Sequence, residues 1–278
     1  MTLCELKREA VSILSENSDV ESPAREAAIL AEAFLGLSRT KQLTDPDMEI
    51  PDSDAEMLLS KARLRKNHHP MAYITGIKDF WGLEFRVNEN VLIPRPDTET
   101  LVEEALKEMK PKARILDMCT GSGAIGISVK ASSDAEVTLS DISPDALEKA
   151  RENAENLVGG NCRLILSDLF ENIDERFDMI LTNPPYLTHE WVDSVTDEVK
   201  KEPLLALLDE APDGLDIIRR IIKDAPSHLN DGGILMIECD YRQAHDCAII
   251  LKKSGFEDIR IIKDLSGRER VVRGTRHA

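Results

Sequence analysis

Apolar residues recur every three to four positions in three stretches of the first 70 residues, at 2–14, 22–36 and 53–70. This is the spacing of an amphipathic helix. The first and third stretches open with Thr or Ser followed three residues later by Glu, the sequence of a capping box. The second opens with Ser-Pro and closes with Gly, residues that favour a helix start and a helix end. The pattern predicts a small bundle of three short helices over residues 1–71.

The apolar pattern changes between residues 72 and 93, where β-branched and aromatic residues partly alternate with polar ones. Asn88-Glu89-Asn90 supplies a turn within this stretch, so we expect a β-hairpin there. The hairpin would lead into Pro94-Arg95-Pro96, whose fixed proline φ angles make a stiff elbow. Residues 72–97 are therefore predicted to link the helical bundle to the main domain.

From about residue 98 onward, short apolar runs typical of strands alternate with helical segments. The predicted strands are Arg114–Met118, Val137–Asp141, Arg163–Ser167, Met179–Thr182, Ile234–Cys239, Ile259–Lys263 and Arg270–Val272. Such alternation indicates a mostly parallel sheet covered on both faces. The short turn around Ser266-Gly267 permits only antiparallel pairing, so one reversed strand is expected. Residues 98–278 are therefore predicted to form one α/β domain.

Composition and charge limit the class of protein. No apolar stretch approaches the length that crosses a bilayer, and the N-terminus lacks the basic and apolar regions of a signal peptide. The five cysteines are scattered and never spaced as CxxC, which favours reduced thiols in a cytoplasm over a disulfide framework or a zinc site. The net charge of −17 opposes a long contact with a phosphate backbone, so no stable nucleic-acid binding is expected. The tail arginines 268, 270, 273 and 276 are expected to be solvated or to protect a sheet edge.

A glycine-rich turn follows the first strand of the main domain. It reads Cys119-Thr120-Gly121-Ser122-Gly123, with Gly126 in the helix that follows, and glycines there let the backbone approach a ligand at the helix N-terminus. Asp141 ends the next strand, where a ribose-binding acid belongs, so the spacing also matches an NAD site. Asp117 is expected to receive the ammonium group of an amino acid, which NAD lacks, and Asp168 to receive an adenine amino group. These two acids favour S-adenosylmethionine as the cofactor.

The tetrapeptide Asn183-Pro184-Pro185-Tyr186 directly follows the fourth strand. Its two prolines fix the backbone and remove two N–H donors, which leaves the Asn183 side-chain oxygen and the Pro184 carbonyl as acceptors. This pair can accept both N–H bonds of a planar NH2 group, on which Tyr186 would stack. The tetrapeptide predicts a catalytic, substrate-binding site without a metal. The NH2 nitrogen would attack the sulfonium methyl there and leave S-adenosylhomocysteine as product.

Together these segments resemble the protein-(glutamine-N5) methyltransferases acting on peptide chain release factors, the HemK/PrmC family. The resemblance covers nearly the whole chain, including the N-terminal bundle, Phe80-Trp81-Gly82-Leu83, Leu92-Ile93-Pro94-Arg95-Pro96-Asp97-Thr98-Glu99, Asp117–Gly126, Asn183–Tyr186 and Gly267-Arg268-x-Arg270. It implies a class I (Rossmann-like) methyltransferase sheet and the glutamine of a Gly-Gly-Gln loop as acceptor. It also implies cofactor contacts at Cys119–Gly123, Asp141, Leu169 and Asn183, substrate contacts at Asn183–Tyr186, and a grip on the release factor by the bundle.

Three positions differ from the family or have two interpretations. Cys119 replaces a glycine that is usual in the cofactor loop, and Leu169 stands where an aromatic residue often covers the adenine. Arg95 is a candidate to bind a carboxylate or the release factor, and equally a candidate for a structural salt bridge.

Other functions share parts of this pattern. The tetrapeptide also occurs in enzymes that methylate an exocyclic amine of RNA or DNA, but those should carry a basic, aromatic-rich surface, and only 4% of this chain is aromatic. Glutamine methyltransferases of ribosomal proteins look similar and stay an alternative. An NAD-dependent oxidoreductase leaves Asn183–Tyr186 without a role, and a non-catalytic binding module does not explain the intact Asp117, Asp141 and Asn183.

Overall fold

The computed structural model describes residues 1–277, which divide into two compact units. The first unit comprises Met1–Ile77 and Val195–Lys201, and the second comprises Lys78–Ser194 and the chain from Glu202 onward. The sheet domain thus contributes a short segment to the N-terminal unit, which contiguous sequence patterns do not predict. The expected division into parts 1–71, 72–97 and 98–278 stays a prediction.

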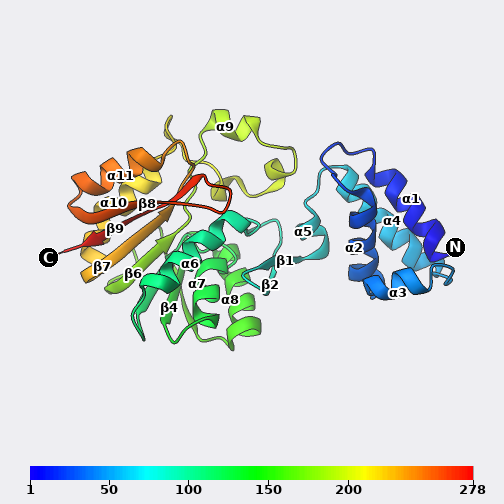
Figure 1. The fold of residues 1–278 in the computed structure, drawn as a ribbon, viewed down its shortest axis with the longest axis horizontal. Helices are drawn as coiled ribbons and strands as arrows, with labels where there is room; N and C mark the ends of the chain where they lie inside the picture. The colour runs from blue at the N-terminus through cyan, green and yellow to red at the C-terminus, as the bar shows by residue number, and fades with distance from the viewer. Residues whose placement is uncertain (278) are drawn as a thin grey trace. The chain divides into compact units, whose positions relative to one another are not determined.

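The N-terminal unit is a helical bundle (Figure 1). Its helices are α1 (Leu3–Leu14), α2 (Pro23–Leu35), α3 (Arg39–Thr44), α4 (Asp52–Lys66) and α5 (Met71–Thr75), with the 3-10 helix η2 at Val199–Lys201. The predicted capping box of α1 is confirmed, because Thr2 Oγ1 accepts from the Glu5 amide and the Glu5 carboxylate accepts from the Thr2 amide. Gly36, at a left-handed φ of 66°, ends α2 as expected.

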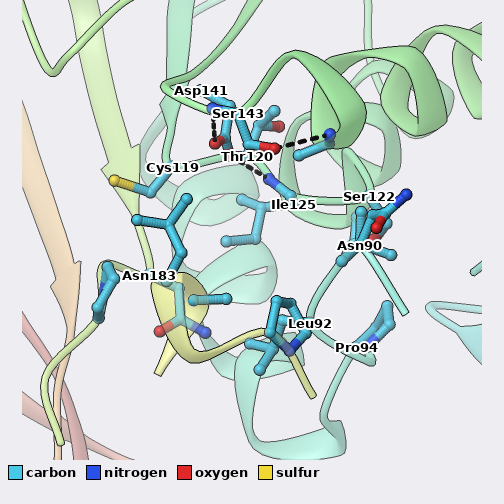
Figure 2. A pocket seen from close by; sticks show the side chains of 18 of the residues that line it. Asn90, Leu92, Pro94, Cys119, Thr120, Ser122, Ile125, Asp141, Ser143 and Asn183 are labelled. Atoms are coloured by element: carbon cyan, nitrogen blue, oxygen red, sulfur yellow. Dashed lines mark hydrogen bonds between the residues drawn. The ribbon is translucent and has the colours of Figure 1, made fainter. Parts of the chain in front are cut away.

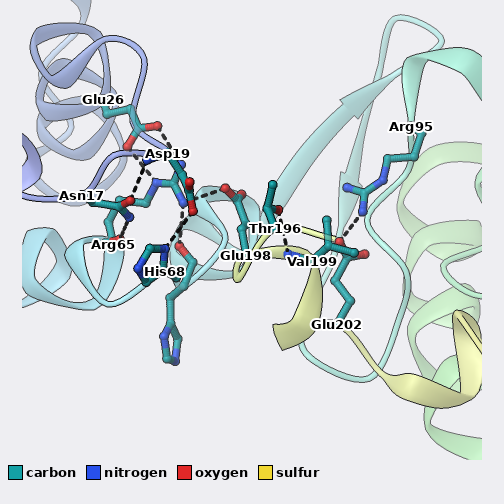
Figure 3. A network of polar contacts seen from close by, with 11 residues as sticks. Asn17, Asp19, Glu26, Arg65, His68, Arg95, Thr196, Glu198, Val199 and Glu202 are labelled. Atoms are coloured by element: carbon teal, nitrogen blue, oxygen red, sulfur yellow. Dashed lines mark hydrogen bonds and ion pairs between the residues drawn. The ribbon is translucent and has the colours of Figure 1, made fainter. Parts of the chain in front are cut away.

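A buried arginine stabilises this unit together with its apolar core. Arg65 is only 3% exposed, and its guanidinium donates to Glu26 and to Glu198, each at 2.8 Å (Figure 3). Asn17 in turn donates to the Arg65 carbonyl. A buried cation is tolerated when carboxylates satisfy it, so Arg65 holds the 195–201 segment within the bundle.

The N-terminal region differs from the prediction in three details. The capping box at Ser53 does not form, because α4 already begins at Asp52, after Pro51, and has no side-chain cap. The short helix α3 was not predicted. Residues 71–75 form helix α5, which packs on α2 and α4 and ends at Gly76, with a φ of 76°. Tertiary contacts therefore outweigh the strand propensity of its β-branched residues.

The hairpin exists, but it is shorter than predicted and turns elsewhere. Strands β1 (Ile77–Phe80) and β2 (Leu83–Arg86) are joined through Trp81 and Gly82, both at positive φ. Two successive positive φ angles match the twist of a two-residue hairpin, so the reversal occurs there. The Asn88–Asn90 turn forms after β2, where the Asn88 carbonyl accepts from the Val91 amide.

The main domain is a seven-stranded sheet with the order β5-β4-β3-β6-β7-β9-β8 (Figure 1). The strands are β3 (Arg114–Met118), β4 (Glu136–Asp141), β5 (Cys162–Leu166), β6 (Phe177–Thr182), β7 (Leu229–Glu238), β8 (Phe256–Lys263) and β9 (Glu269–Arg276). The helices are α6 (Glu99–Glu108), α7 (Ala124–Ala131), α8 (Pro144–Val158), α9 (His189–Ser194), α10 (Asp216–His228) and α11 (Ala244–Lys253), with 3-10 helices η1 (Pro96–Thr98) and η3 (Leu204–Ala206). The predicted α/β sheet with one reversed strand is confirmed, since β9 pairs antiparallel with both β7 and β8 while the other neighbouring strands pair parallel.

The sheet is covered by helices on both faces, and successive side chains of one strand enter different cores. In β3, Leu116 packs in the core that includes residues of α10 and α11. Its neighbour Ile115 packs in the core that includes residues of α6, α7 and α8. This two-sided burial explains the continuous apolar runs of the central strands.

The expectation for the tail arginines is wrong at two positions. Because β9 lies between β7 and β8, its side chains are covered, and both Arg270 and Arg273 are buried. Arg273 pairs with Glu108, and Arg270 pairs with Asp97 and Asp264. Within the described chain, no helix has both the length and the apolar character that crossing a membrane requires.

Candidate active site

Two loops that follow neighbouring strands meet at the carboxyl edge of the sheet. β3 pairs with β4 on one side and with β6 on the other, and Met118 lies opposite Thr182 in the register. Crevices form at such a point, where the chain leaves a central strand in opposite directions. The glycine loop (residues 119–123) and the tetrapeptide (residues 183–186) therefore begin side by side.

The glycine loop is held by β4. The Thr120 amide donates to the Ser140 carbonyl at 3.0 Å, and the Gly121 amide donates to the Asp141 carboxylate at 2.8 Å. Cys119 adopts a left-handed φ of 56°, which glycine takes without strain and a side chain disfavours. Burial raises the pKa of the Cys119 thiol, so this side chain lines the cavities in its neutral form.

Gly126 and Gly121 each need to be glycine, for different reasons. A Cβ at Gly126 would lie 2.4 Å from Leu139 Cδ2, so only glycine lets α7 pack this closely on the sheet. A Cβ at Gly121 would meet nothing within 4 Å, at a φ of 54°. Gly121 lines the first cavity, and its bare backbone leaves room for a ligand to approach.

Asp117 lies beneath the glycine loop, which differs from the expected contact with an ammonium group. It is 0% exposed and lines neither cavity, and its Oδ2 accepts from the Thr120 hydroxyl at 2.5 Å and the Gly126 amide at 2.8 Å. Burial raises the pKa of Asp117 to about 7. The carboxyl therefore organises the backbone of the loop rather than facing a ligand.

Two cavities, of about 200 Å³ and about 450 Å³, open on these loops. The first is bounded by parts of segment 90–98, the glycine loop, the start of α8, Asn183, Pro185 and part of segment 203–206. Figure 2 shows Asn183 on the opposite side of this cavity from Asp141 and Ser143. The second is bounded by the ends of β3, β4 and β5, by Leu169 and by the start of α10. Cys119, Asp141 and Pro185 line both, so the two cavities adjoin.

Two acidic residues of the second cavity, Asp141 and Asp168, differ in how free their carboxylates are to bind a ligand. Asp141 accepts from the Gly121 and Ser143 amides and keeps lone pairs that point to neither, as a ribose-binding carboxylate requires. Asp168 forms an ion pair with Arg220 at 3.0 Å, so its expected contact with an adenine has a competitor. Leu169, at a φ of 48°, is 9% exposed and supplies an apolar wall.

The side-chain amide of Asn183 has a defined direction. Its Nδ2 donates to Thr98 Oγ1 at 3.4 Å. None of residues 1–277 donates to its Oδ1, and the residue lines the first cavity. Asn183 Oδ1 is therefore free to accept a hydrogen bond at this cavity, and its role as the acceptor for a substrate amide stays a prediction.

The rest of the tetrapeptide is less open than expected. Pro185 lines both cavities, whereas Pro184 is buried and Tyr186 lines neither cavity. Burial, and the nearby charge of Glu238, raise the pKa of the Tyr186 phenol, so it stays neutral. Gln243 donates to the Tyr186 carbonyl at 3.0 Å and holds the backbone after the prolines. The roles of Pro184 as an acceptor and of Tyr186 in stacking stay predictions.

Arg95 forms a structural salt bridge, and its contact with a carboxylate or the release factor stays a prediction. Its guanidinium forms an ion pair with the buried Glu202, which also accepts from the Ile93 amide (Figure 3). The side chain is 37% exposed and lines the first cavity. A structural salt bridge therefore holds Arg95 where a substrate can reach it.

Sequence reasoning missed several residues of the site. Leu92, Pro94 and Thr98 line the first cavity, and Leu205 lines both. The first three lie in the Leu92–Glu99 segment that carries the family resemblance, which was the available signal. Nothing local marks Leu205, because its place depends on the path of the chain after the tetrapeptide. Within residues 1–277, no group of three or more His, Cys, Asp or Glu side chains is arranged to hold a metal ion.

Two family models and several full-length relatives match this chain. The PrmC N-terminal domain matches residues 5–76, and the methyltransferase small domain matches residues 96–204. The release factor glutamine methyltransferase of Salmonella typhimurium is 37% identical over 92% of this chain and 93% of its own length. That of Clostridium botulinum is 38% identical over the full length of both chains.

The chain belongs to the release factor glutamine methyltransferase family. The resemblance read from the motifs is thereby confirmed, and the chain is a methyltransferase rather than an NAD-dependent oxidoreductase or a non-catalytic module. The structure of a T. thermophilus 16S rRNA N2 G1207 methyltransferase, in complex with AdoMet and guanosine, aligns with a TM-score of 0.54 at 18% identity. It covers 72% of this chain and 50% of that one, and it shows the shared Rossmann-like fold of the family's catalytic domain.

Proposed function

We propose that this methyltransferase transfers a methyl group from S-adenosylmethionine to the side-chain amide nitrogen of a glutamine in a peptide chain release factor. The observation that carries the proposal is the position of Asn183. Its Oδ1 has no donor within the described chain and lies at a cavity that the glycine loop also lines. The names of the full-length relatives support the choice of acceptor.

The residues around the two cavities fit S-adenosylmethionine. The open space at Gly121 admits a ligand against the loop backbone, and Asp141 offers a carboxylate to ribose hydroxyls. Residues 119–123, Asp141, Leu169 and Asn183 would hold the cofactor, with Asp168 near the adenine end. When bound, S-adenosylmethionine supplies a methyl whose carbon–sulfur bond breaks as the nitrogen–carbon bond forms, leaving S-adenosylhomocysteine.

The tetrapeptide would act on the acceptor nitrogen. The lone pair of an amide nitrogen is delocalised into the carbonyl, so the nitrogen is a weak nucleophile. Asn183 Oδ1 and the Pro184 carbonyl would accept its two N–H bonds, aim the nitrogen and favour the positive charge that develops on it. The nitrogen then releases one proton to solvent, which restores a neutral amide. Tyr186 would stack on the planar group.

The proposed acceptor is the glutamine of a Gly-Gly-Gln loop. Arg95, at the first cavity, is available to the loop of the release factor, and we assign part of the grip on that protein to the N-terminal bundle. The net charge of −17 favours a protein over a nucleic-acid substrate. We place the reaction in the cytoplasm, where the five free cysteines would stay reduced.

The test combines labelled S-adenosylmethionine with a release factor and with the same factor carrying Gln→Ala in its Gly-Gly-Gln loop. We expect label on the intact factor only, at that glutamine by mass spectrometry. Asn183→Ala should abolish transfer, while calorimetry shows a cofactor dissociation constant within a few-fold of the parent. The matched control is Asn161→Ala, an exposed asparagine between α8 and β5 that should transfer normally.

Three results would overturn the proposal. Label on RNA would indicate a base methyltransferase, and label on a ribosomal protein alone would change the acceptor. Normal transfer by Asn183→Ala would refute the role assigned to its amide.

A further inference from the structure

The direction of the Asn183 amide is a chemical requirement of the proposed function. The two orientations of an asparagine amide have nearly the same shape, so its hydrogen-bond partners decide which one is adopted. Only the orientation with Oδ1 toward the acceptor nitrogen can accept an N–H bond. The reverse would present two donors to two donors. Whatever fixes this orientation therefore controls whether the tetrapeptide works.

Thr98 is the partner that Nδ2 has in the structure. It lies at the junction of η1 and α6, is 4% exposed and accepts from Asn183 Nδ2 at 3.4 Å. A threonine hydroxyl can donate one hydrogen bond and accept others, so it can hold either end of an amide. Thr98 therefore selects one orientation only if another group determines where its own proton points.

Glu238 is that group. It ends β7, next to the strand that leads into the tetrapeptide, and a hydrogen bond with the Thr98 side chain lowers its pKa. An ionised carboxylate can only accept, so Thr98 must donate to Glu238 and can only accept from Asn183. That arrangement puts Nδ2 toward Thr98 and Oδ1 toward the cavity. A protonated Glu238 can donate to Thr98, which releases the Thr98 proton for Asn183 Oδ1 and permits the reversed amide.

The surroundings of Glu238 allow such a change near neutral pH. It is 2% exposed and its Oε2 has no hydrogen-bond partner among residues 1–277. Burial, the largest cause, raises its pKa to about 7, against the lowering effects of Thr98 and Arg270. The charged and titratable groups that face it are Arg270 on β9, Arg95 and Asp97 before α6, and the neutral phenol of Tyr186.

We propose that Thr98 and Glu238 are positioning residues for methyl transfer: the ionised Glu238 carboxylate accepts a hydrogen bond from the Thr98 hydroxyl, so that the Thr98 oxygen accepts from Asn183 Nδ2 and the Asn183 amide oxygen faces the acceptor nitrogen. The inference rests on the proposed function for its consequence. The orientation itself rests on the hydrogen bond from Asn183 Nδ2 to Thr98 and on the contact of the Thr98 side chain with the buried Glu238. Glu238 lines neither cavity, and Thr98 would act through the Asn183 amide.

The orientation is tested first without any substrate. In protein labelled with ¹⁵N-asparagine, the Asn183 side-chain signals are identified by their loss in Asn183→Ala. We expect them to shift with a midpoint near pH 7 in the parent, following Glu238, and to show no such shift in Glu238→Gln. Asp117, whose pKa burial also raises to about 7, is present in both proteins, so the comparison isolates Glu238. The proposal would be overturned if the Asn183 signals of the parent do not shift with pH, or if they shift with the same midpoint in Glu238→Gln.

Methyl transfer gives the second measurement. Thr98→Val should lower kcat about tenfold, as expected for losing control of one catalytic hydrogen bond, with cofactor affinity within twofold. Thr98→Ser, which restores the hydroxyl, should recover most of kcat. In the parent, kcat should fall as pH drops below about 7, when Glu238 becomes protonated, and Glu238→Gln should lose this dependence.

The matched control is Thr100→Val. Thr100 is a buried threonine in α6, two residues after Thr98, and it does not line the first cavity. This variant should keep kcat within twofold. Equal kcat in Thr98→Val and the parent, or a Thr98→Ser no better than Thr98→Val, would refute the positioning role. If the parent shows the expected NMR titration but methylates no glutamine, the proposed function fails while the orientation mechanism stands.

Discussion

Gly214 is the position where a single methyl group should most directly disturb the tetrapeptide. Gly214 lies just before α10 at a left-handed φ of 66°. An added Cβ would lie 2.2 Å from the Tyr186 carbonyl oxygen and 2.6 Å from Gln243 Nε2. Gln243 donates to both the Tyr186 and the Gly214 carbonyls, at 3.0 and 3.1 Å. Gly214→Ala must therefore move backbone next to the prolines, not only a flexible side chain.

The expected cost of Gly214→Ala has two parts. A side chain in the left-handed region costs roughly 1–2 kcal/mol. Overpacking against fixed atoms adds about 1–3 kcal/mol. The free energy of unfolding should therefore fall by roughly 2–5 kcal/mol. For a domain of this size each kcal/mol lowers Tm by about 2–4 °C, which gives a fall of roughly 4–20 °C in all. We also expect kcat to fall, because the displaced carbonyl belongs to the residue that ends the tetrapeptide.

Gly232→Ala is the matched control for this experiment. Gly232 has a similar φ of 72°, but a Cβ there would meet nothing within 4 Å, and it lies toward the opposite end of β7 from the site. Gly232→Ala should lower the free energy of unfolding only by the cost of a side chain in the left-handed region, roughly 1–2 kcal/mol. Its kcat should stay within twofold of the parent's. Thermal unfolding and transfer of labelled methyl measure both effects. Equal losses of Tm and kcat in the two variants would refute the steric argument.

Two further predictions concern the cofactor side of the site. Burial raises the folded-state pKa of Asp117 from 3.8 to about 7, so the parent loses stability as pH rises through this window and Asp117→Asn does not. The Tm of Asp117→Asn relative to the parent should therefore increase between pH 5 and pH 8, and a constant difference would contradict the assigned titration. Leu169→Phe should lower the dissociation constant of S-adenosylmethionine roughly two- to tenfold by calorimetry, because an aromatic ring can stack on the adenine. Unchanged or weaker binding would place the adenine away from residue 169.

Local features of the site were predictable because they depend on residues adjacent in the chain. The glycine loop needs a short run of glycines after a strand, and the tetrapeptide needs Asn-Pro-Pro-Tyr after another. Parallel strands bring their carboxyl ends to one edge, so the meeting of the two loops followed from the alternation of strands and helices. Asp117 was misjudged because sequence shows that an acid precedes the loop but not whether its carboxyl faces the loop backbone or the cavity.

By itself, the sequence determined the α/β class, the single reversed strand, the positions of the glycine loop and the tetrapeptide, and the family, since each depends on patterns within contiguous segments. Tertiary structure alone decided that β9 lies inside the sheet, which buries Arg270. It also brought Thr98 to Asn183 across 85 positions of sequence and placed Glu238 at their side. Such contacts depend on strand order and helix packing, and these are set by how distant segments share a core rather than by any local pattern.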